Sequence, residues 1–365
     1  MIKEIDGRTS VLIAGGYGIV GAQVAELLAS RNPELEIIIG GRSEAAAAAA
    51  AERIAGARGV RVDIDEVDPL AKFAKLPDAI IAVANDGDDR LLRAAVTRGI
   101  AYVDITRWTE RMQASILRLA PMRPTAPVLL SSGWMAGVTA TVAAANARNF
   151  AQVSSIDIDI LYALKDKAGP NSLDYVDRLL IPFPVTIDGK VEMKKSMSEP
   201  RAVRFSGDRL FNTYRFDTPE QYTLVHATGA ASVSSRLSYD NASAINSMRF
   251  LINSGIWKLL SLSTFDKLRR SMLYNPGEGD AHEVVIETHG TDPAGRPIRT
   301  RSTILDPLGQ THMTAVGAVT GLERVLGLRK RQRAPIGVSL PEHCSDLDAT
   351  LRAFAEMGVE IRSEP

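Results

Sequence analysis

The sequence contains one cysteine, few histidines and no net charge, and each of these shortages excludes a class of protein. Cys344 has no second cysteine to pair with, which excludes an internal disulfide and favours a reducing compartment. The five histidines show no H-E-x-x-H pattern, and Cys344 has no partner at zinc-ligand spacing, so we expect no metal site. Lys plus Arg and Asp plus Glu both total 43, and no basic block predicts nucleic-acid binding.

Long hydrophobic runs are also lacking. No apolar stretch approaches the roughly 20 residues needed to cross a bilayer, and the polar N-terminus shows no signal peptide. We therefore expect a cytoplasmic, globular protein without a membrane span. Its 365 residues are enough for about two domains.

The most informative feature that is present is a glycine-rich turn between an apolar β-type run and a helical run. The dinucleotide-binding pattern G-x-G-x-x-G is formed by Gly16, Tyr17, Gly18, Ile19, Val20 and Gly21. Gly16 allows the tight turn, Gly18 lets the backbone approach a pyrophosphate, and Gly21 lets the helix pack closely. The start of the following helix, predicted over 18–30, favours phosphates.

The end of the second strand predicts a preference for NADP(H). The run 35–40 ends in Gly41, Arg42 and Ser43, about twenty residues after the glycine pattern, where an NAD site usually has an acidic residue. An arginine fork and a small hydroxyl suit a 2′-phosphate instead. A solvated arginine at the start of a helix is the alternative.

The first 150 residues alternate strands and helices, which predicts a doubly wound parallel Rossmann sheet. We expect strands at 9–14, 35–39, 60–64, 79–84, 101–105 and 127–131, and helices near 18–30, 43–57, 69–75, 87–98, 108–120 and 137–149. Apolar strands such as 79–84 are typical of a sheet that is buried on both faces.

From about residue 152 the pattern changes to alternating apolar and polar residues, as in strands with one wet face. Such runs at 155–162, 185–187, 202–205, 283–289 and 298–304 predict an inserted α+β domain built on a mainly antiparallel sheet. We assign 1–150 to the Rossmann domain, 151–310 to a substrate and dimerisation domain, and 311–365 to a segment that returns to the first domain. For the apolar stretch 243–273 we consider three alternatives: it covers the sheet, it forms a dimer contact, or it touches a membrane surface. We expect a homodimer.

Six segments together resemble the saccharopine dehydrogenase-like family. They are Gly15–Gly21, Gly41–Ser43, Val62-Asp63, Tyr102–Thr106, Ser132–Gly137 and the late Thr311–Ala315. The resemblance implies a Rossmann domain with an inserted domain, NADP(H) as cofactor and Asp63 and Gly133 in its site. The chain departs from the family after Asp104, where Ile-Thr-Arg replaces Thr-Ser-aromatic. It also has Ala136 where the family commonly shows proline, so we transfer the reaction type and not the substrate.

Ligands of an open α/β sheet bind beyond the carboxyl ends of the strands. That rule places Ala84, Asn85 and Asp86 near the nicotinamide, together with Asp104 and Trp134. Asn85 either contacts the cofactor or caps the next helix. Asp104 either acts on the substrate or is a carboxylate whose hydrogen bonds are satisfied at a helix N-terminus. Trp134 either forms a wall of the site or belongs to the core.

An amino-acid substrate needs cations for its carboxylates. Arg107 is the first candidate, ahead of Arg178, Arg201 and Arg204, and ordinary surface arginines are the alternative. His312 is the histidine that we keep as a possible proton donor, against a buried structural role.

These observations predict an NADPH-dependent oxidoreductase acting on a C=N or C=O bond of an amino-acid-derived, small-molecule substrate. Two other hypotheses stay open. One is an enoyl or ketone reductase for a lipid or natural-product intermediate, and the other is an NADP(H)-binding sensor without turnover.

Overall fold

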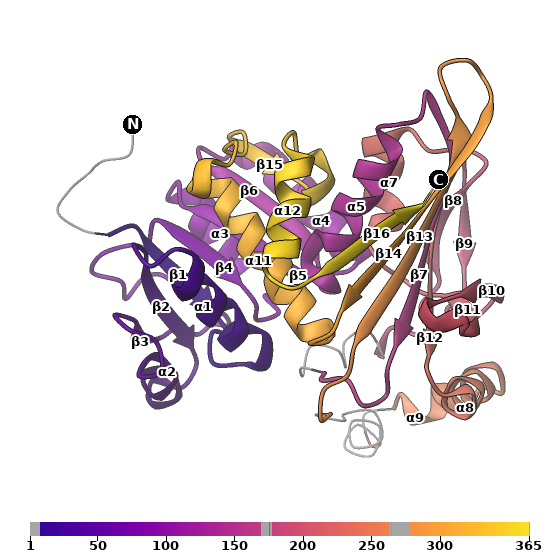
Figure 1. The fold of residues 1–365 in the computed structure, drawn as a ribbon. Coiled ribbons are helices and arrows are strands. Elements are labelled where there is room, and N and C mark those ends of the chain that lie inside the picture. Colours follow the sequence, from indigo (N-terminus) through magenta and orange to yellow (C-terminus); the bar gives the residue numbers. More distant parts are fainter. Residues whose placement is uncertain (1–7, 169–174, 176, 263, 265–276, 365) are drawn as a thin grey trace. The chain divides into compact units, whose positions relative to one another are not determined.

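The structure, a computed structural model, describes residues 8–168, 175, 177–262, 264 and 277–364. These residues divide into two compact units (Figure 1). The first unit is formed by the chain up to residue 107, by 112–136 and by 314–341. The second unit takes 108–111, 137–313 and the chain from 342 on. Each unit is therefore assembled from separate stretches of the sequence.

In the described part of the first unit, seven strands form one sheet in the order β15-β6-β5-β4-β1-β2-β3, and all neighbours are parallel. The strands are β1 (Ser10–Ala14), β2 (Glu36–Gly41), β3 (Arg58–Arg61), β4 (Ala79–Ala82), β5 (Ala101–Arg107), β6 (Pro127–Ser132) and β15 (Gly337–Ser339). The order from β3 to β6 is that of a Rossmann domain. The predicted doubly wound sheet is confirmed.

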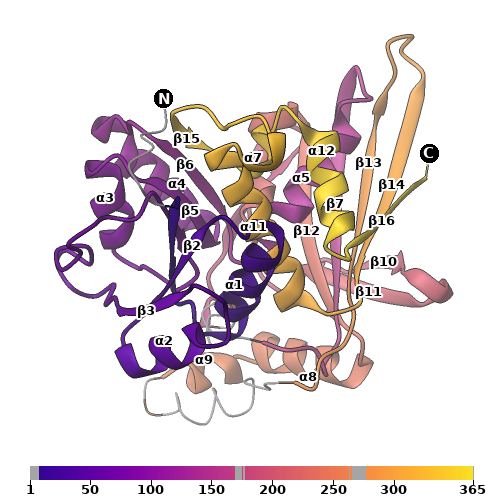
Figure 2. The same ribbon diagram turned by 60° about the vertical axis from the view of Figure 1, so that its left-hand side comes forward.

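Helices cover both faces of this sheet because its strands are apolar on both sides (Figure 2). The helices that carry residues of the unit are α1 (Ile19–Arg31), α2 (Glu44–Ala51), α3 (Arg90–Thr97), α4 (Thr109–Leu119) and α11 (Gln310–Leu326). Leu12, Ile80 and Tyr102 pack with residues of α3 and α4 in one core cluster. On the opposite face, a Cβ at Gly321 of α11 would lie 2.8 Å from Leu129, so this glycine lets α11 approach the sheet closely.

Two predicted elements of the first unit are wrong or displaced. Residues 69–75 form successive turns rather than a helix. Asp68 accepts a hydrogen bond from the Leu70 N–H, and Pro77 disfavours helical backbone just before it. The third strand, predicted at 60–64, lies at Arg58–Arg61, where it pairs with the end of β2.

In the described part of the second unit, nine strands form a mixed, mainly antiparallel sheet, as predicted. Its main order is β10-β11-β12-β7-β13-β14-β16, β8 and β9 form a side branch, and only β7 and β12 pair in parallel. The strands are β7 (Gln152–Tyr162), β8 (Phe183–Ile187), β9 (Lys190–Lys194), β10 (Arg201–Arg204), β11 (Leu210–Arg215), β12 (Ser232–Tyr239), β13 (His282–Thr291), β14 (Pro297–Asp306) and β16 (Glu360–Glu364).

The two faces of this second sheet differ in chemistry. Apolar side chains such as Ile158 and Ile286 are fully buried. Helices α5 (Val138–Ala147), α7 (Glu220–Thr228) and α12 (Leu347–Glu356) belong to the same unit. Asp157 and Asp159, on the alternate positions of β7, pair with Arg201 and Arg236. The period-2 pattern of the sequence therefore separates an apolar face from a face rich in ion pairs.

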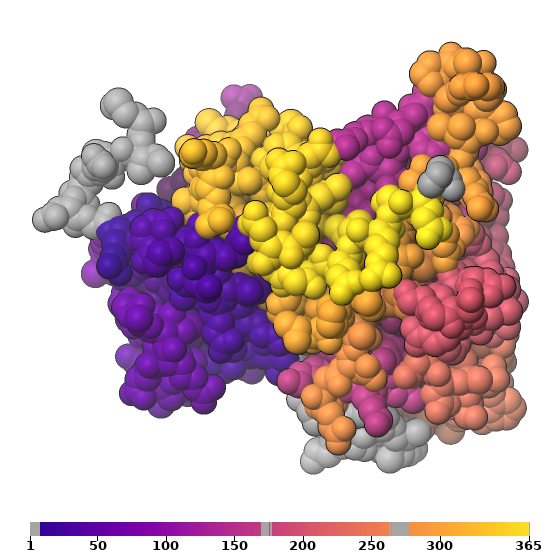
Figure 3. Space-filling model, in the orientation of Figure 1, coloured from indigo at the N-terminus to yellow at the C-terminus, as the bar shows by residue number. Residues whose placement is uncertain are grey.

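The domain boundaries that we predicted differ from the division into units at two places. Helix α5, assigned to the Rossmann domain, lies in the second unit, where Asn146 accepts a hydrogen bond from Ser302 of β14. The end of the chain also lies there, because β16 pairs with β14. Figure 3 shows this terminal stretch in yellow beside the orange strands. Of the predicted returning segment, 314–341 lies in the first unit.

The apolar stretch predicted as helical over 243–273 begins with α8 (Ala242–Asn253) and α9 (Ile256–Leu260), separated at Gly255 as expected. Trp257 is buried, whereas Phe250 and Leu259 are 65% and 58% exposed. The rest of the stretch, residues 263 and 265–273, lies outside the described residues. Within those residues, no helix combines the length and the hydropathy that crossing a membrane requires.

Asp159 on β7 predicts how the stability of the second unit depends on pH. Burial raises the pKa of this carboxyl group to about 6, although Arg201 and the Thr213 hydroxyl act in the opposite direction. In the unfolded chain this carboxyl group has a pKa of about 3.9, so it loses its proton at a lower pH than in the folded protein. The free energy of unfolding should therefore fall by roughly 2–3 kcal/mol between about pH 4 and about pH 6.

Replacing Asp159 with asparagine should remove that part of the pH dependence, as measured by urea unfolding at several pH values. Asp208→Asn is the matched control, because the Asp208 side chain is 88% exposed. If the free energies of unfolding of wild type and Asp159→Asn differed by the same amount at every pH in this range, the prediction would be contradicted.

Candidate functional site

The glycine-rich turn joins β1 to α1 at the carboxyl end of the first sheet. Gly15 has a φ of +90°, and its N–H donates to the Gly40 carbonyl at 2.8 Å. The Gly18 N–H donates to the Gly15 carbonyl at 3.0 Å, which closes the turn directly before α1. The turn is therefore fixed by backbone hydrogen bonds to the neighbouring strand and to itself.

The three glycines of the pattern are needed for different reasons. A Cβ at Gly21 would lie 2.2 Å from the Gly15 carbonyl oxygen, and one at Gly16 would lie 2.9 Å from the Ile13 carbonyl oxygen. At these two positions the protein's own backbone fills the space that a side chain would need. At Gly18 a Cβ would meet one atom within 4 Å, the Gly15 oxygen at 3.3 Å. The open space beside Gly18 is what a pyrophosphate cradle requires.

The start of α1 suits an anion. Gly18 precedes the first helical residue, no side chain caps the helix there, and its first turn contains no acidic residue. The amide groups and the dipole of a 13-residue helix therefore favour negative charge at this end. The residues present fit the pyrophosphate of a dinucleotide.

Tyr17 and the end of β2 form the adjoining part of the site. A Cβ at Gly41 would lie 2.2 Å from the Tyr17 ring, so the ring lies directly on the Gly41 backbone. The Ser43 N–H donates to the Tyr17 hydroxyl at 3.4 Å, and the Ser43 hydroxyl caps α2 by accepting from Ala46. Arg42 is exposed, and within the described residues its guanidinium has no hydrogen bond or ion pair. It is available to an added phosphate.

The strand ends beside the turn hold the other predicted cofactor residues. Ala84 lies against the turn, since a Cβ at Gly15 would be 2.9 Å from the Ala84 nitrogen. Asp86 is buried and accepts hydrogen bonds from the Arg90 and Leu91 amides, so it caps the start of α3. Burial raises the pKa of Asp86 above its ordinary value.

The two remaining predictions at this edge concern Asn85 and Asp63. Asn85 is half-buried, and the helix cap that we considered for it is supplied by Asp86. Asp63 forms an ion pair with Arg61 at 3.0 Å, just after β3. The predicted contacts of both residues with the cofactor stay predictions.

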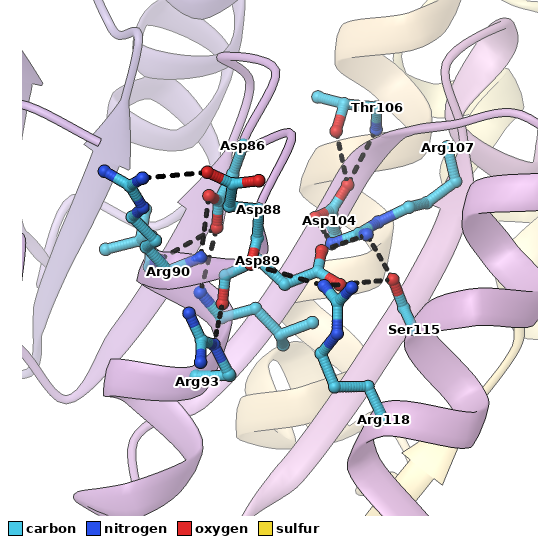
Figure 4. A network of polar contacts seen from close by, with 12 residues as sticks. Asp86, Asp88, Asp89, Arg90, Arg93, Asp104, Thr106, Arg107, Ser115 and Arg118 are labelled. Carbon is cyan, nitrogen blue, oxygen red and sulfur yellow. Dashed lines mark hydrogen bonds and ion pairs between the residues drawn. The ribbon is translucent and has the colours of Figure 1, made fainter. Parts of the chain in front are cut away.

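Asp104 and Arg107 at the end of β5 lie in a buried ion-pair network (Figure 4). One Asp104 oxygen accepts from the Thr106 amide and hydroxyl, both at 2.8 Å, and the other accepts from Arg107. The fully buried Arg107 guanidinium also binds Asp89 and the Ser115 hydroxyl. Burial alone would lower the pKa of Arg107, but Asp104 and Asp89 raise it above its ordinary value.

This burial corrects our expectation for Arg107. Its guanidinium is already occupied by two carboxylates and is shielded from solvent, so a substrate carboxylate does not reach it. Asp104 is satisfied by Thr106 and Arg107 within β5 and not at the helix start that we considered as its alternative, and its action on the substrate stays a prediction. Asp89, the second partner of Arg107, was not predicted from the sequence. The acidic run Asp86–Asp89 was the available signal.

Gly133 and Trp134 follow β6. The Gly133 N–H donates to the Arg107 carbonyl at 2.8 Å, and the Ser132 hydroxyl donates to the Trp134 carbonyl at 2.6 Å. Trp134 is 8% exposed. Met135 and Ala136 both have positive φ, a backbone conformation that costs energy in non-glycine residues and often occurs at functional sites.

His312 and the other candidate arginines belong to the second unit. The His312 Nδ1 pairs with Asp306 at 2.7 Å, and its side chain is 9% exposed. Arg178 lies over the Trp108 ring and binds Glu110, whereas Arg201 binds Asp159 and Glu287. Arg204 forms an exposed pair with Asp208. Within the described residues, no group of three or more potential ligands is arranged to hold a metal ion.

Known proteins resemble this chain in its nucleotide-binding part and in its fold. Residues 11–153 match the family described as saccharopine dehydrogenase NADP binding domain. The whole chain resembles apo saccharopine dehydrogenase (L-Glu forming) from Saccharomyces cerevisiae, with a TM-score of 0.69 and 14% identity over 98% of this chain and 99% of that one. An amine dehydrogenase from Mycobacterium smegmatis is similar with a TM-score of 0.48 and 14% identity, over 94% and 97% of the two chains. No curated protein matches the sequence.

The glycine turn thus belongs to a dinucleotide-binding protein of the Rossmann class. Residues 11–153 match the saccharopine dehydrogenase NADP binding domain, and the whole chain shares its fold with saccharopine dehydrogenase. The resemblance, the fold class and the NADP(H) cofactor that the sequence predicted are confirmed.

Proposed function

We propose that this protein is an NADPH-dependent oxidoreductase that reduces an imine, or a carbonyl, of an amino-acid-derived substrate. The observation that carries the proposal is the cradle at Gly18, where the protein leaves space and an uncapped helix start. The match of residues 11–153 to a saccharopine dehydrogenase NADP-binding domain supports the type of reaction.

The residues around the turn would hold the cofactor. Gly18 and the first amides of α1 would bind the pyrophosphate, and Arg42 with Ser43 would bind the 2′-phosphate. Bound NADPH supplies a hydride. Such a reduction asks the protein mainly to align the reactants and to exclude water, and Trp134 is the large apolar side chain that we propose for that role.

The His312–Asp306 pair is our proposal for the proton donor. With Nδ1 bound to the buried Asp306 carboxylate, Nε2 is the nitrogen left to give or take a proton. Asp306 would orient the ring. The homodimer and the cytoplasmic location that we predicted are part of this proposal.

A second candidate substrate class is favoured by the exposed apolar side chains of α8 and α9. Phe250 and Leu259 are more than half exposed. Such side chains suit an acyl chain better than an amino acid. A reductase for an enoyl or ketone group on a lipid intermediate would use the same cofactor cradle.

A paired fluorescence titration with NADPH and NADH tests the proposal first. We expect tighter binding of NADPH, followed by its oxidation in the presence of an amino acid together with an aldehyde or 2-oxo acid. Oxidation with enoyl or keto lipids alone would favour the second candidate. Binding without oxidation by either group would favour a sensor, and a folded protein that binds neither nucleotide would contradict the proposal.

A further inference from the structure

The buried arginine of the first unit lies at an irregular point of β5. Arg107 lies at a β-bulge, because the pairing of β5 with β6 shifts between Asp104 and Arg107. The extra residue turns the Arg107 side chain to the same face as Asp104, toward α3 and α4. Without the bulge, strict alternation would place it on the opposite face.

The other end of this network is the loop between β4 and α3, residues 83–89. Its beginning is fixed to the end of β1, directly before the glycine turn, since the Val83 and Ala84 amides both donate to the Ala14 carbonyl. Its end is Asp89, which has a φ of +55° and binds Arg107, Ser115 and Arg118. Figure 4 shows these side chains converging on Asp89 from β5 and α4.

We propose that Arg107 is a positioning residue for the cofactor. By binding Asp89 and Asp104 together it fixes the loop 83–89 against the carboxyl end of β4, on the nicotinamide side of the glycine turn. The inference rests on the NADPH binding of the proposed function. It assigns Arg107 no contact with substrate.

The geometry explains why arginine occupies this position. Its planar fork donates to two carboxylates and one hydroxyl at the same time, which fixes their relative positions. A lysine would keep the positive charge that two buried carboxylates need, but it is a point charge on a flexible stem. Arg107→Lys therefore keeps the charge balance and loosens the loop.

The test is a titration of wild type and Arg107→Lys with NADPH and with 2′,5′-ADP, which lacks the nicotinamide half. We expect NADPH binding to weaken roughly tenfold, the factor that one charge-assisted hydrogen bond is worth. Binding of 2′,5′-ADP should stay within about twofold, because it uses the glycine turn and Arg42. Arg118→Lys is the matched control, since Arg118 binds the same Asp89 but is 43% exposed and should leave both ligands unaffected.

Equal weakening of both ligands would show a general structural role and overturn the proposal, as would an unchanged affinity for NADPH. If Arg107→Lys does not fold, Ser115→Ala removes one acceptor of the same guanidinium without removing a charge. It should weaken NADPH alone, by about threefold, and no change there would also overturn the inference. Failure of wild type to bind either ligand would instead contradict the proposed function.

Discussion

Replacing Gly18 with valine should weaken the binding of NADPH and NADH by roughly a thousandfold, because the side chain would occupy the space left for the pyrophosphate. The protein should still fold. Gly18 has a φ of −74° and a ψ of 171°, which valine adopts readily, and its Cβ would meet one backbone oxygen at 3.3 Å. Isothermal titration with both nucleotides, together with thermal unfolding, measures the two effects separately.

Gly21→Val is the contrasting variant. Its Cβ would lie 2.2 Å from the Gly15 carbonyl oxygen, so α1 cannot keep its place beside the turn and we expect loss of the folded state. Gly18→Ala should be intermediate in binding and close to wild type in stability. Retained binding by a folded Gly18→Val variant would mean that the nucleotide lies elsewhere.

Replacing Arg42 with alanine should weaken NADPH binding by roughly a hundredfold and NADH binding by less than about threefold. The guanidinium has no partner among the described residues, so its removal leaves no protein group unpaired and its effect falls on the ligand. Only NADPH carries the 2′-phosphate that a charged fork recognises. Competition titrations with both nucleotides give the ratio directly.

Arg53→Ala is the matched control for Arg42→Ala, because Arg53 is also exposed and lies after α2 instead of before it. It should bind both nucleotides as wild type does. An equal loss for NADPH and NADH in Arg42→Ala would show that Arg42 does not read the 2′-phosphate.

The sequence predicted the first sheet well because local signals there agree with one another. The run from Val11 to Gly21 combines a buried strand, a turn that only glycine fits and a helix start. The helix expected at 69–75 failed because Asp68 and Pro77 favour isolated turns, which apolar periodicity does not reveal.

The candidate site was predictable in its cofactor part and much less so in its chemistry. The predicted strand ends at residue 105, and residues beyond a strand end usually face ligands, but Arg107 is the last residue of β5 and one extra residue in that strand turns it into the core. Its partner Asp89 lies 18 positions away, in a left-handed backbone conformation that is uncommon outside glycine. Such long-range pairings depend on the fold and leave no local pattern in the sequence.

The return of the chain to the first unit has a consequence for how this protein is made. Strand β15 pairs with β6, although 177 residues of second-unit sequence, 137–313, are synthesised between them. The strands from β7 to β14 are therefore synthesised before helix α11 and before β15, the edge strand of the first sheet. A gene cut after residue 150 would yield a nucleotide-binding sheet with an open edge at β6 and a bare apolar face.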